Sequence, residues 1–172
     1  LFGPPVYVRR QIDHNPFVVA DLSRKGAVFV EDVDEAPPGS LLIFSAHGVS
    51  PAVRHAAQAR GLRVIDATCP LVTKVHLEAV RYARAGYTII LVGHAGHDEV
   101  AGTLGEAPGR IHLVGTRDDA EAVQAPDANR VAIISQTTLS VDDTRGIIEV
   151  LRRRFPRMVT PARSDICFAT QN

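Results

Sequence analysis

Short runs of β-branched and other apolar residues alternate along the chain with segments in which apolar residues recur at helical spacing. Each run is bounded by small or polar residues, which is the pattern of a buried strand. We therefore predict strands over residues 6–9, 27–31, 41–45, 63–66, 88–93, 111–114 and 131–135. The helical spacing predicts helices over residues 51–60, 70–85, 118–125 and 141–155.

The regular alternation of strands and helices predicts an α/β fold. Parallel strands joined by right-handed crossovers form sheets that helices cover on both faces, and ligands bind beyond the carboxyl ends of the strands. We expect consecutive small βαβ lobes with mainly parallel sheets around a central cavity. The first lobe is predicted over residues 1–69, incomplete at its N-terminus, and the second over 70–164. Residues 165–172 are predicted to start a truncated third lobe.

The composition narrows the class of protein further. Of the 172 residues, 45% are hydrophobic and 22% are charged, and no apolar run reaches the length of about 18 residues that a membrane span needs. Nineteen basic and nineteen acidic residues balance, so the net charge indicates neither a nucleic acid nor a membrane as partner. The two cysteines, Cys69 and Cys167, form no disulfide framework, and we expect a cytoplasmic protein with a small-molecule partner.

Five polar segments stand out, and most of them directly follow a predicted strand. They are residues 13–15, 45–50, 66–74, 93–99 and 135–143. A single polar strand end is an ordinary turn. Several in succession that carry histidine, cysteine or paired hydroxyls indicate a shared pocket.

Cys69 lies between a predicted strand and Pro70, at the start of a predicted helix. Backbone N–H groups and the positive end of the helix dipole favour a thiolate at such a position, and a thiolate acts as a nucleophile or a metal ligand. The alternative is a small buried hydrophobic residue, since free cysteine is among the most buried residue types.

The segment from Gly93 to His97 contains glycines that let the backbone approach an anion, and histidines that can donate hydrogen bonds to it. It lacks the Gly-Lys-Ser/Thr ending of a Walker A loop and the spacing of a His-Glu-x-x-His zinc site. Each histidine also has an ordinary alternative. His47 and His94 would then be satisfied structural residues, and His14 a surface turn residue.

Glu99 follows these histidines and is either a helix-end acid or a proton relay. Thr137 and Thr138 either cap the last helix or offer neutral hydroxyls to a substrate. Three further histidines stand at helix or strand positions without polar company and are assigned to the surface or the core: His55, His76 and His112.

Taken together, the polar segments resemble a known family, the 4-hydroxy-3-methylbut-2-enyl diphosphate reductases. The matching segments, in the family's order and spacing, are Ser-Ala-His-Gly-Val-Ser, Asp-Ala-Thr-Cys-Pro-Leu-Val-Thr-Lys-Val-His, Gly-His-Ala-Gly-His-Asp-Glu-Val, Gln-Thr-Thr-Leu-Ser-Val-Asp-Asp-Thr and Asp-Ile-Cys-Phe-Ala-Thr-Gln-Asn. The resemblance runs from Pro5 to Asn172. It implies a three-lobed α/β protein around a 4Fe–4S cluster that three cysteines hold, with the fourth iron left for the substrate. It also implies the last step of the methylerythritol phosphate pathway, in which an allylic hydroxyl is removed reductively to give isopentenyl and dimethylallyl diphosphate.

The resemblance assigns ligands to both the cluster and the diphosphate. Cys69 and Cys167 match two of the three cluster ligands. His14, His47 and His97 match the histidines that hold the diphosphate. These roles agree with the chemistry of thiolates and imidazoles.

The resemblance also implies the catalytic residues and the electron donor. Glu99 matches the acid that relays protons to the leaving hydroxyl, and Thr137 matches the hydroxyl residue beside it. Thr170 falls near the substrate in the family. A ferredoxin or flavodoxin is the implied electron donor.

The chain departs from the family at both ends. These 172 residues contain neither the Gly-Phe-Cys-Ala-Gly-Val loop that supplies the family's first cysteine nor the Ser-Asn diphosphate residues of its third lobe. Two thiolates are too few for a three-cysteine site. We therefore expect a fragment that is inactive alone and belongs to an active reductase. Its incomplete first lobe should have an exposed sheet edge and an uncovered face.

Two alternatives from other classes remain. One is a noncatalytic diphosphate-binding module that keeps the histidine pocket and has lost the cluster. The other is a hydrolase that uses His94, His97 and Glu99 on a divalent metal ion, which would leave both cysteines without a role.

Overall fold

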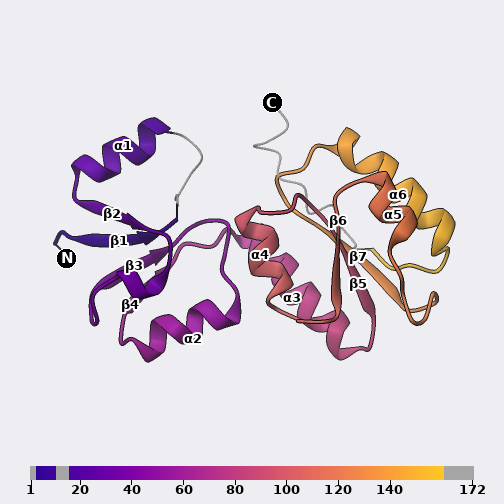
Figure 1. Cartoon of the computed structure of the whole chain (residues 1–172), viewed down its shortest axis with the longest axis horizontal. Coiled ribbons are helices and arrows are strands. Elements are labelled where there is room, and N and C mark those ends of the chain that lie inside the picture. The colour runs from indigo at the N-terminus through magenta and orange to yellow at the C-terminus, as the bar shows by residue number, and fades with distance from the viewer. Residues whose placement is uncertain (1–2, 11–15, 161–172) are drawn as a thin grey trace. The chain divides into compact units, whose positions relative to one another are not determined.

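The computed structural model describes residues 3–10 and 16–160. The chain divides into two compact units, Leu1–Cys69 and Pro70–Asn172, which we name the first unit and the second unit (Figure 1). Each unit contains one parallel β-sheet, and within each unit strands alternate with helices along the chain.

The first unit is built on a four-stranded sheet in the order β2-β1-β3-β4. Its strands are β1 (Val6–Arg9), β2 (Ala27–Val30), β3 (Leu41–Phe44) and β4 (Arg63–Asp66). Its helices are α1 (Pro16–Arg24), the short 3-10 helix η1 (Val33–Glu35) and α2 (Pro51–Ala59). Ser50 caps α2 by accepting a hydrogen bond from the backbone N–H of Val53, as the serine before a proline in the sequence indicates.

One face of this sheet packs against α2. Leu42 and Phe44 of β3 form an apolar cluster there with Ala57 of α2. Ile65 of β4 pairs with Ile43, so it points to the opposite face, and 44% of its surface is exposed. Helix α1 has no buried residue, and every residue of β4 is exposed.

The second unit has a three-stranded sheet in the order β6-β5-β7. Its strands are β5 (Thr88–Val92), β6 (Ile111–Val114) and β7 (Val131–Ser135). Its helices are α3 (Pro70–Arg84), α4 (Asp98–Leu104), α5 (Arg117–Ala122) and α6 (Val141–Arg154). Val159 forms a parallel bridge with Ala132 and so extends the sheet beyond β7.

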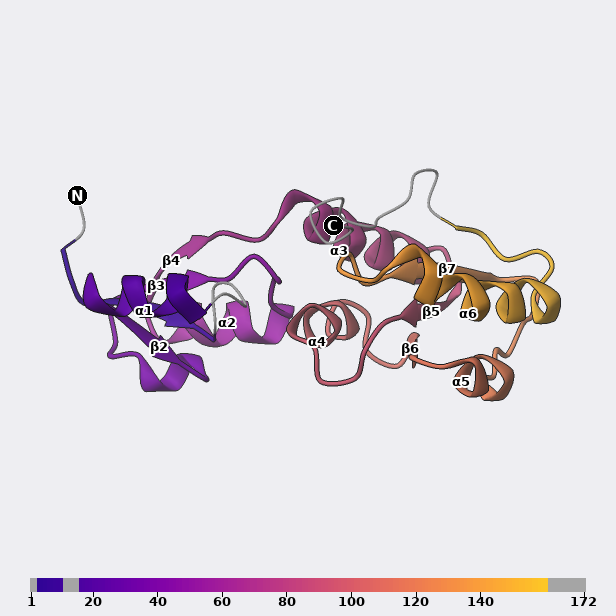
Figure 2. The same cartoon turned by 90° about the horizontal axis from the view of Figure 1, so that it is seen from above.

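Helices cover both faces of the second sheet (Figure 2). On one face, Val75 of α3 packs in a cluster with Ile89 and Leu91 of β5. On the other face, Leu151 of α6 packs in a cluster with Ile90. Because alternate residues of a strand point to opposite faces, β5 is buried on both sides. This central strand gives the loops at its carboxyl end a rigid base.

The structure confirms the predicted α/β fold class and its parallel sheets. All predicted strands are present, with ends shifted by one residue at most. The helix predicted over 118–125 ends earlier, at Ala122. The pattern did not predict α1 or α4, since α1 buries no residue and α4 has only seven residues. The central cavity stays a prediction, and residues 165–172, predicted to start a third lobe, lie outside the described part. No helix in the described ranges combines the length and apolarity that crossing a membrane requires.

Candidate functional site

The carboxylate of Glu99 is bound by Thr137 at the carboxyl edge of the second sheet. Glu99 lies in the first turn of α4, after β5, and Thr137 lies just after β7. The backbone N–H of Thr137 donates to Glu99 Oε1 over 2.6 Å, and its hydroxyl donates to Oε2 over 2.9 Å. Glu99 is 1% exposed, and Thr137 is buried as well. Since β5 and β7 are adjacent parallel strands, their ends bring the two residues together.

His97 caps the helix that carries Glu99. Its Nδ1 accepts a hydrogen bond from the Glu99 backbone N–H over 3.2 Å. Gly96 precedes it with a φ of +83°, a left-handed conformation that favours glycine. A ring nitrogen that accepts carries no hydrogen, so the hydrogen of the neutral His97 ring is on Nε2. His97 can therefore donate from Nε2 to an anion while it holds the start of α4.

Gln136 ties together the loops that follow β5 and β7. It is 2% exposed and stands directly after β7. Its Oε1 accepts from the backbone N–H of His94 over 3.0 Å, and its Nε2 donates to Thr138 Oγ1 over 2.6 Å. Gly93 permits this close approach, because a Cβ there would meet Val100 Cγ2 at 2.7 Å and Gln136 Oε1 at 3.2 Å. The amide thus fixes one loop against the other.

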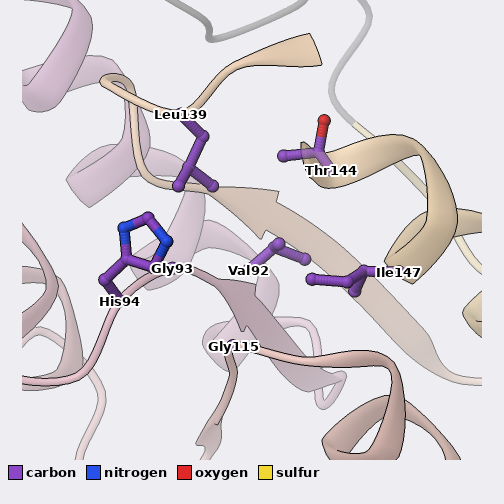
Figure 3. A pocket seen from close by; sticks show the side chains of 7 residues that line it. All are labelled: Val92, Gly93, His94, Gly115, Leu139, Thr144 and Ile147. Atoms are coloured by element: carbon purple, nitrogen blue, oxygen red, sulfur yellow. The ribbon is translucent and has the colours of Figure 1, made fainter. Parts of the chain in front are cut away.

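A small pocket opens at the same edge of the sheet (Figure 3). Its lining comes from the ends of all three strands and from α6: Val92, Gly93, His94, Gly115, Leu139, Thr144 and Ile147. The volume of about 30 Å³ leaves room for only a few water molecules. A diphosphate does not fit inside this pocket.

In the first unit, neighbouring loops carry His47 and Cys69. His47 lies in the turn after β3, and Cys69 follows β4, the strand that pairs with β3. The pairing continues past the strand ends, since the Ala67 N–H donates to the Phe44 carbonyl over 3.1 Å and the Cys69 N–H donates to the Ala46 carbonyl over 2.9 Å. His47 follows Ala46 directly. The backbone therefore holds the imidazole-bearing and thiol-bearing residues on adjacent loops.

The turn after β3 also brings His47 against Ser45. The Nδ1 atom of His47 lies 3.4 Å from Ser45 Oγ, and both side chains are buried. Gly48 closes the turn by donating its N–H to the Ser45 carbonyl over 3.2 Å. Its φ of +75° again favours glycine, which explains the Ala-His-Gly sequence at this point.

Cys69 lies at the start of α3, directly before the first residue of the helix. It is half-buried. Asp66 holds the turn before Cys69, because its carboxylate accepts hydrogen bonds from the backbone N–H and the hydroxyl of Thr68. No group of three or more His, Cys, Asp or Glu in the described ranges is placed to hold a metal ion.

The described structure places five of the sequence-predicted site residues. Within the second unit it brings together Glu99, Thr137 and His97. Within the first unit it brings together the loops of His47 and Cys69. The remaining candidates lie outside the described residues: His14, Cys167 and Thr170.

Sequence reasoning gave no role to Ser45 or Gln136, although both stand in polar segments that it singled out. Each is the first residue after a strand, a position from which a side chain can reach a neighbouring loop. Sequence reasoning also missed the polar partner of His76. Its Nδ1 lies 2.8 Å from Glu106 Oε1, and both side chains are buried. The prediction that His76 lacks polar company was wrong, because its partner comes from a separate segment.

Comparison with known proteins places this chain among relatives of one kind. The family model described as LytB protein matches residues 2–172. The 4-hydroxy-3-methylbut-2-enyl diphosphate reductase of Acidothermus cellulolyticus is 60% identical over 172 residues, which are 100% of this chain and 51% of that protein. The reductase of the same name from Rhodopirellula baltica is 60% identical over 171 residues, covering 99% of this chain and 54% of that protein.

A solved structure agrees with these relatives. The E-1-hydroxy-2-methyl-but-2-enyl-4-diphosphate reductase from Plasmodium falciparum is 44% identical with a TM-score of 0.95, covering 99% of this chain and 54% of that chain. This chain thus spans about half the length of the curated relatives it matches. Since the family model covers nearly every residue, the chain belongs to the LytB protein family.

Proposed function

We propose that this chain is part of a 4-hydroxy-3-methylbut-2-enyl diphosphate reductase, an iron–sulfur oxidoreductase. The complete enzyme would remove the allylic hydroxyl of its substrate and release isopentenyl and dimethylallyl diphosphate, the last step of the methylerythritol phosphate pathway. The names of the relatives support this activity. The observation that carries it is the buried Glu99 carboxylate, which both donors of Thr137 hold. We expect the 172 residues alone to be inactive, because their two cysteines are too few for the cluster.

The reaction consumes two electrons and two protons. The allylic C–O bond breaks, a C–H bond forms, and the hydroxyl leaves as water. One proton goes to the hydroxyl oxygen and the other to carbon. Hydroxide is a poor leaving group, so a proton donor placed beside the oxygen lowers the barrier.

Glu99 is suited to deliver the proton to the hydroxyl through Thr137. A hydroxyl both donates and accepts hydrogen bonds. Thr137 Oγ1 can therefore pass a proton from Glu99 Oε2 to an oxygen on its other side. Meanwhile the Thr137 backbone N–H on Oε1 keeps the carboxylate in place. Burial of both residues keeps bulk water from competing for the proton.

Three histidines are proposed to hold the diphosphate: His14, His47 and His97. Imidazole N–H groups donate to phosphate oxygens, and a protonated ring adds positive charge. The neutral His97 ring can donate to a phosphate oxygen, because its Nδ1 accepts a hydrogen bond from the Glu99 N–H and its hydrogen is therefore on Nε2. Thr170 is proposed to lie near the substrate.

A 4Fe–4S cluster, when bound, would pass on the two electrons of the external donor one at a time and would offer a Lewis-acidic iron to the hydroxyl oxygen. We propose Cys69 and Cys167 as two of its three ligands, with the third from outside these 172 residues. The half-buried position of Cys69 before α3 supports its part in this set. A ferredoxin or flavodoxin is the proposed electron donor, and the cytoplasm the proposed location.

A chimeric reductase tests this proposal. The matched region of the Acidothermus cellulolyticus relative is replaced by this chain, and the protein is reconstituted with iron and sulfide in the absence of oxygen. We expect a bound 4Fe–4S cluster, seen by its absorbance and iron content, and conversion of the allylic diphosphate into both products with a reduced ferredoxin. Glu99→Gln in this chimera should lower kcat by about 100-fold or more with little change in KM. The amide of glutamine can keep both contacts with Thr137 but does not release a proton.

Glu149→Gln makes the same chemical change on the exposed side of α6 and is the matched control, which should leave kcat unchanged. Undiminished turnover in the Glu99→Gln chimera would remove Glu99 from proton delivery. Pyrophosphate binding without iron uptake would favour the noncatalytic diphosphate-binding module. Zinc-dependent hydrolysis of the diphosphate would favour the hydrolase.

A further inference from the structure

Two histidines, one in each unit, use Nδ1 for a hydrogen bond to a group two residues away. In the second unit, Nδ1 of His97 accepts from the backbone N–H of Glu99. In the first unit, Nδ1 of His47 lies 3.4 Å from Ser45 Oγ. In both cases the partner is two residues away in the sequence. A backbone N–H can only donate, so the tautomer of neutral His97 is settled, with its hydrogen on Nε2.

The direction of the Ser45–His47 hydrogen bond follows from the needs of a buried hydroxyl. Ser45 is 3% exposed, and among the described residues its side chain has His47 as its hydrogen-bond partner. A buried O–H without an acceptor costs free energy. The Ser45 hydroxyl therefore donates to Nδ1, which must then be unprotonated. The hydrogen of the neutral His47 ring is accordingly on Nε2, as in His97.

An anionic ligand needs a hydrogen on the ring nitrogen that binds it, and the neutral tautomer set by Ser45 carries its hydrogen on Nε2. Phosphate oxygens accept hydrogen bonds, so a ring nitrogen that binds one must carry a hydrogen. With Nδ1 directed at Ser45, Nε2 is on the opposite edge of the ring. We propose that Ser45 is a positioning residue, whose hydroxyl holds His47 in one orientation and in the tautomer that donates from Nε2 to a diphosphate oxygen. This inference rests on the proposed function of His47 as a diphosphate ligand and names the residue that prepares it.

Nitrogen-15 NMR of the histidine-labelled 172-residue chain tests the proposal, because protonated and unprotonated ring nitrogens have well-separated chemical shifts. At about pH 9, where an ordinary imidazole is neutral, we expect His47 to show a protonated Nε2 and an unprotonated Nδ1. His47→Gln assigns its signals. In Ser45→Ala both His47 nitrogens should move toward the averaged shifts of mixed tautomers, while the His97 signals stay in place. Ser45→Thr keeps the hydroxyl and should restore the single tautomer.

Ser40→Ala is the matched control. Ser40 stands at the opposite end of β3, and within the described residues its buried hydroxyl has no hydrogen-bond partner. The His47 signals should therefore be unchanged in this variant. Calorimetry with inorganic pyrophosphate on the chimeric reductase adds a binding readout. We expect Ser45→Ala to weaken affinity about two- to tenfold, and Ser45→Thr and Ser40→Ala to leave it unchanged.

Two results would overturn the inference. One is a protonated Nδ1 on His47 in the unsubstituted chain, a result that does not depend on the folding of Ser45→Ala. The other is a His47 tautomer that Ser45→Ala leaves unchanged. If the chimeric reductase is inactive while the tautomer depends on Ser45, the proposed function fails and the role of Ser45 in holding His47 stands. If the chimera is active while the tautomer does not depend on Ser45, the proposed function stands and the role of Ser45 fails.

Discussion

The two units share a parallel α/β plan but differ in how completely their sheets are buried. In the second unit an apolar cluster covers each face of the sheet, and β5 contributes to both. The described part of the first unit has one such cluster, on the α2 face. There α1 buries no residue and β4 is exposed along its length. Apolar burial therefore contributes more to the free energy of unfolding of the second unit than to that of the first unit.

The same difference extends to the site residues. In the second unit, side-chain hydrogen bonds hold the site residues, a buried one from Thr137 to Glu99 and a half-buried one from Gln136 to Thr138. In the first unit, backbone hydrogen bonds beyond the ends of β3 and β4 join the loops of His47 and Cys69, and the buried side chains of Ser45 and His47 contact each other within one turn. The site residues of the second unit thus lie against a sheet with an apolar cluster on each face. Those of the first unit lie beside a sheet for which the described residues form one apolar cluster.

Truncation of a core side chain in the second unit should have the largest effect on stability. Leu151 of α6 is fully buried within one of the two clusters. Leu151→Ala should lower the free energy of unfolding of the second unit by about 3 to 5 kcal/mol, because it removes apolar contacts and leaves a cavity. Ile65→Ala in β4 should lower that of the first unit by only about 0.5 kcal/mol, since Ile65 is partly exposed.

Native-state hydrogen exchange in increasing urea measures both free energies in one sample, because the amides of each unit report on its own opening. Equal losses for the two variants would contradict the difference in burial. Loss of protection throughout the chain in either variant would show that the two units unfold as one.

The strands could be predicted closely because a strand buried on both faces is a short unbroken apolar run. Residues Thr88–Val92 and Val131–Ser135 have this form. Helix α4 could not be predicted from apolar spacing, since its first turn is polar. Two contacts fix this turn: the cap from His97 and the hydrogen bond that Thr137 donates to Glu99.

The motifs also indicated Glu99 and Thr137 before the structure placed them within hydrogen-bond distance. The sequence could not reveal the bonds of Gln136 to the neighbouring loop, because an amide that joins two loops leaves no periodic pattern. His76 illustrates the same limit. It stands on the buried face of α3, where the pattern indicates core, and only the fold brings Glu106 to it.

The His76–Glu106 contact allows a test of intermediate size within the second unit. The two side chains are 5% and 9% exposed, and Nδ1 lies 2.8 Å from Oε1. His76→Leu should lower the free energy of unfolding by about 1 to 3 kcal/mol, because the Glu106 carboxylate loses the imidazole beside it in a buried position. Adding Glu106→Leu should recover most of this loss, since replacing both partners by apolar residues can be nearly neutral.

Urea denaturation followed by circular dichroism, completed for both single variants and the double variant, gives the coupling between the two side chains. Losses that simply add would show that the contact contributes nothing to the second unit. In that case apolar burial alone would account for the difference in stability between the two units.

Two exposed aspartates, one in each unit, give the smallest and most selective test. Hydrogen bonds from Lys25, and then from Arg24, lower the pKa of Asp21 in the first unit. The hydroxyl of Thr116, followed by backbone N–H groups, lowers the pKa of Asp119 at the start of α5 in the second unit. The first pKa therefore depends on neighbouring charges and the second on neutral donors.

Both pKa values are lowered in the folded state, so each carboxylate adds stability above its unfolded pKa of about 3.9 and loses it as the pH falls through the lower folded value. Salt separates the two causes, because exposed ion pairs weaken as the ionic strength rises, whereas a contact with a neutral hydroxyl or N–H is affected much less. Carboxyl carbon NMR titrations at low and high salt, with Asp21→Asn and Asp119→Asn to assign the signals, measure both values. High salt should raise the pKa of Asp21 toward its ordinary value and leave that of Asp119 lowered. A salt response of equal size at both positions would show that charge, and not the local donors of the α5 cap, sets the pKa in the second unit as well.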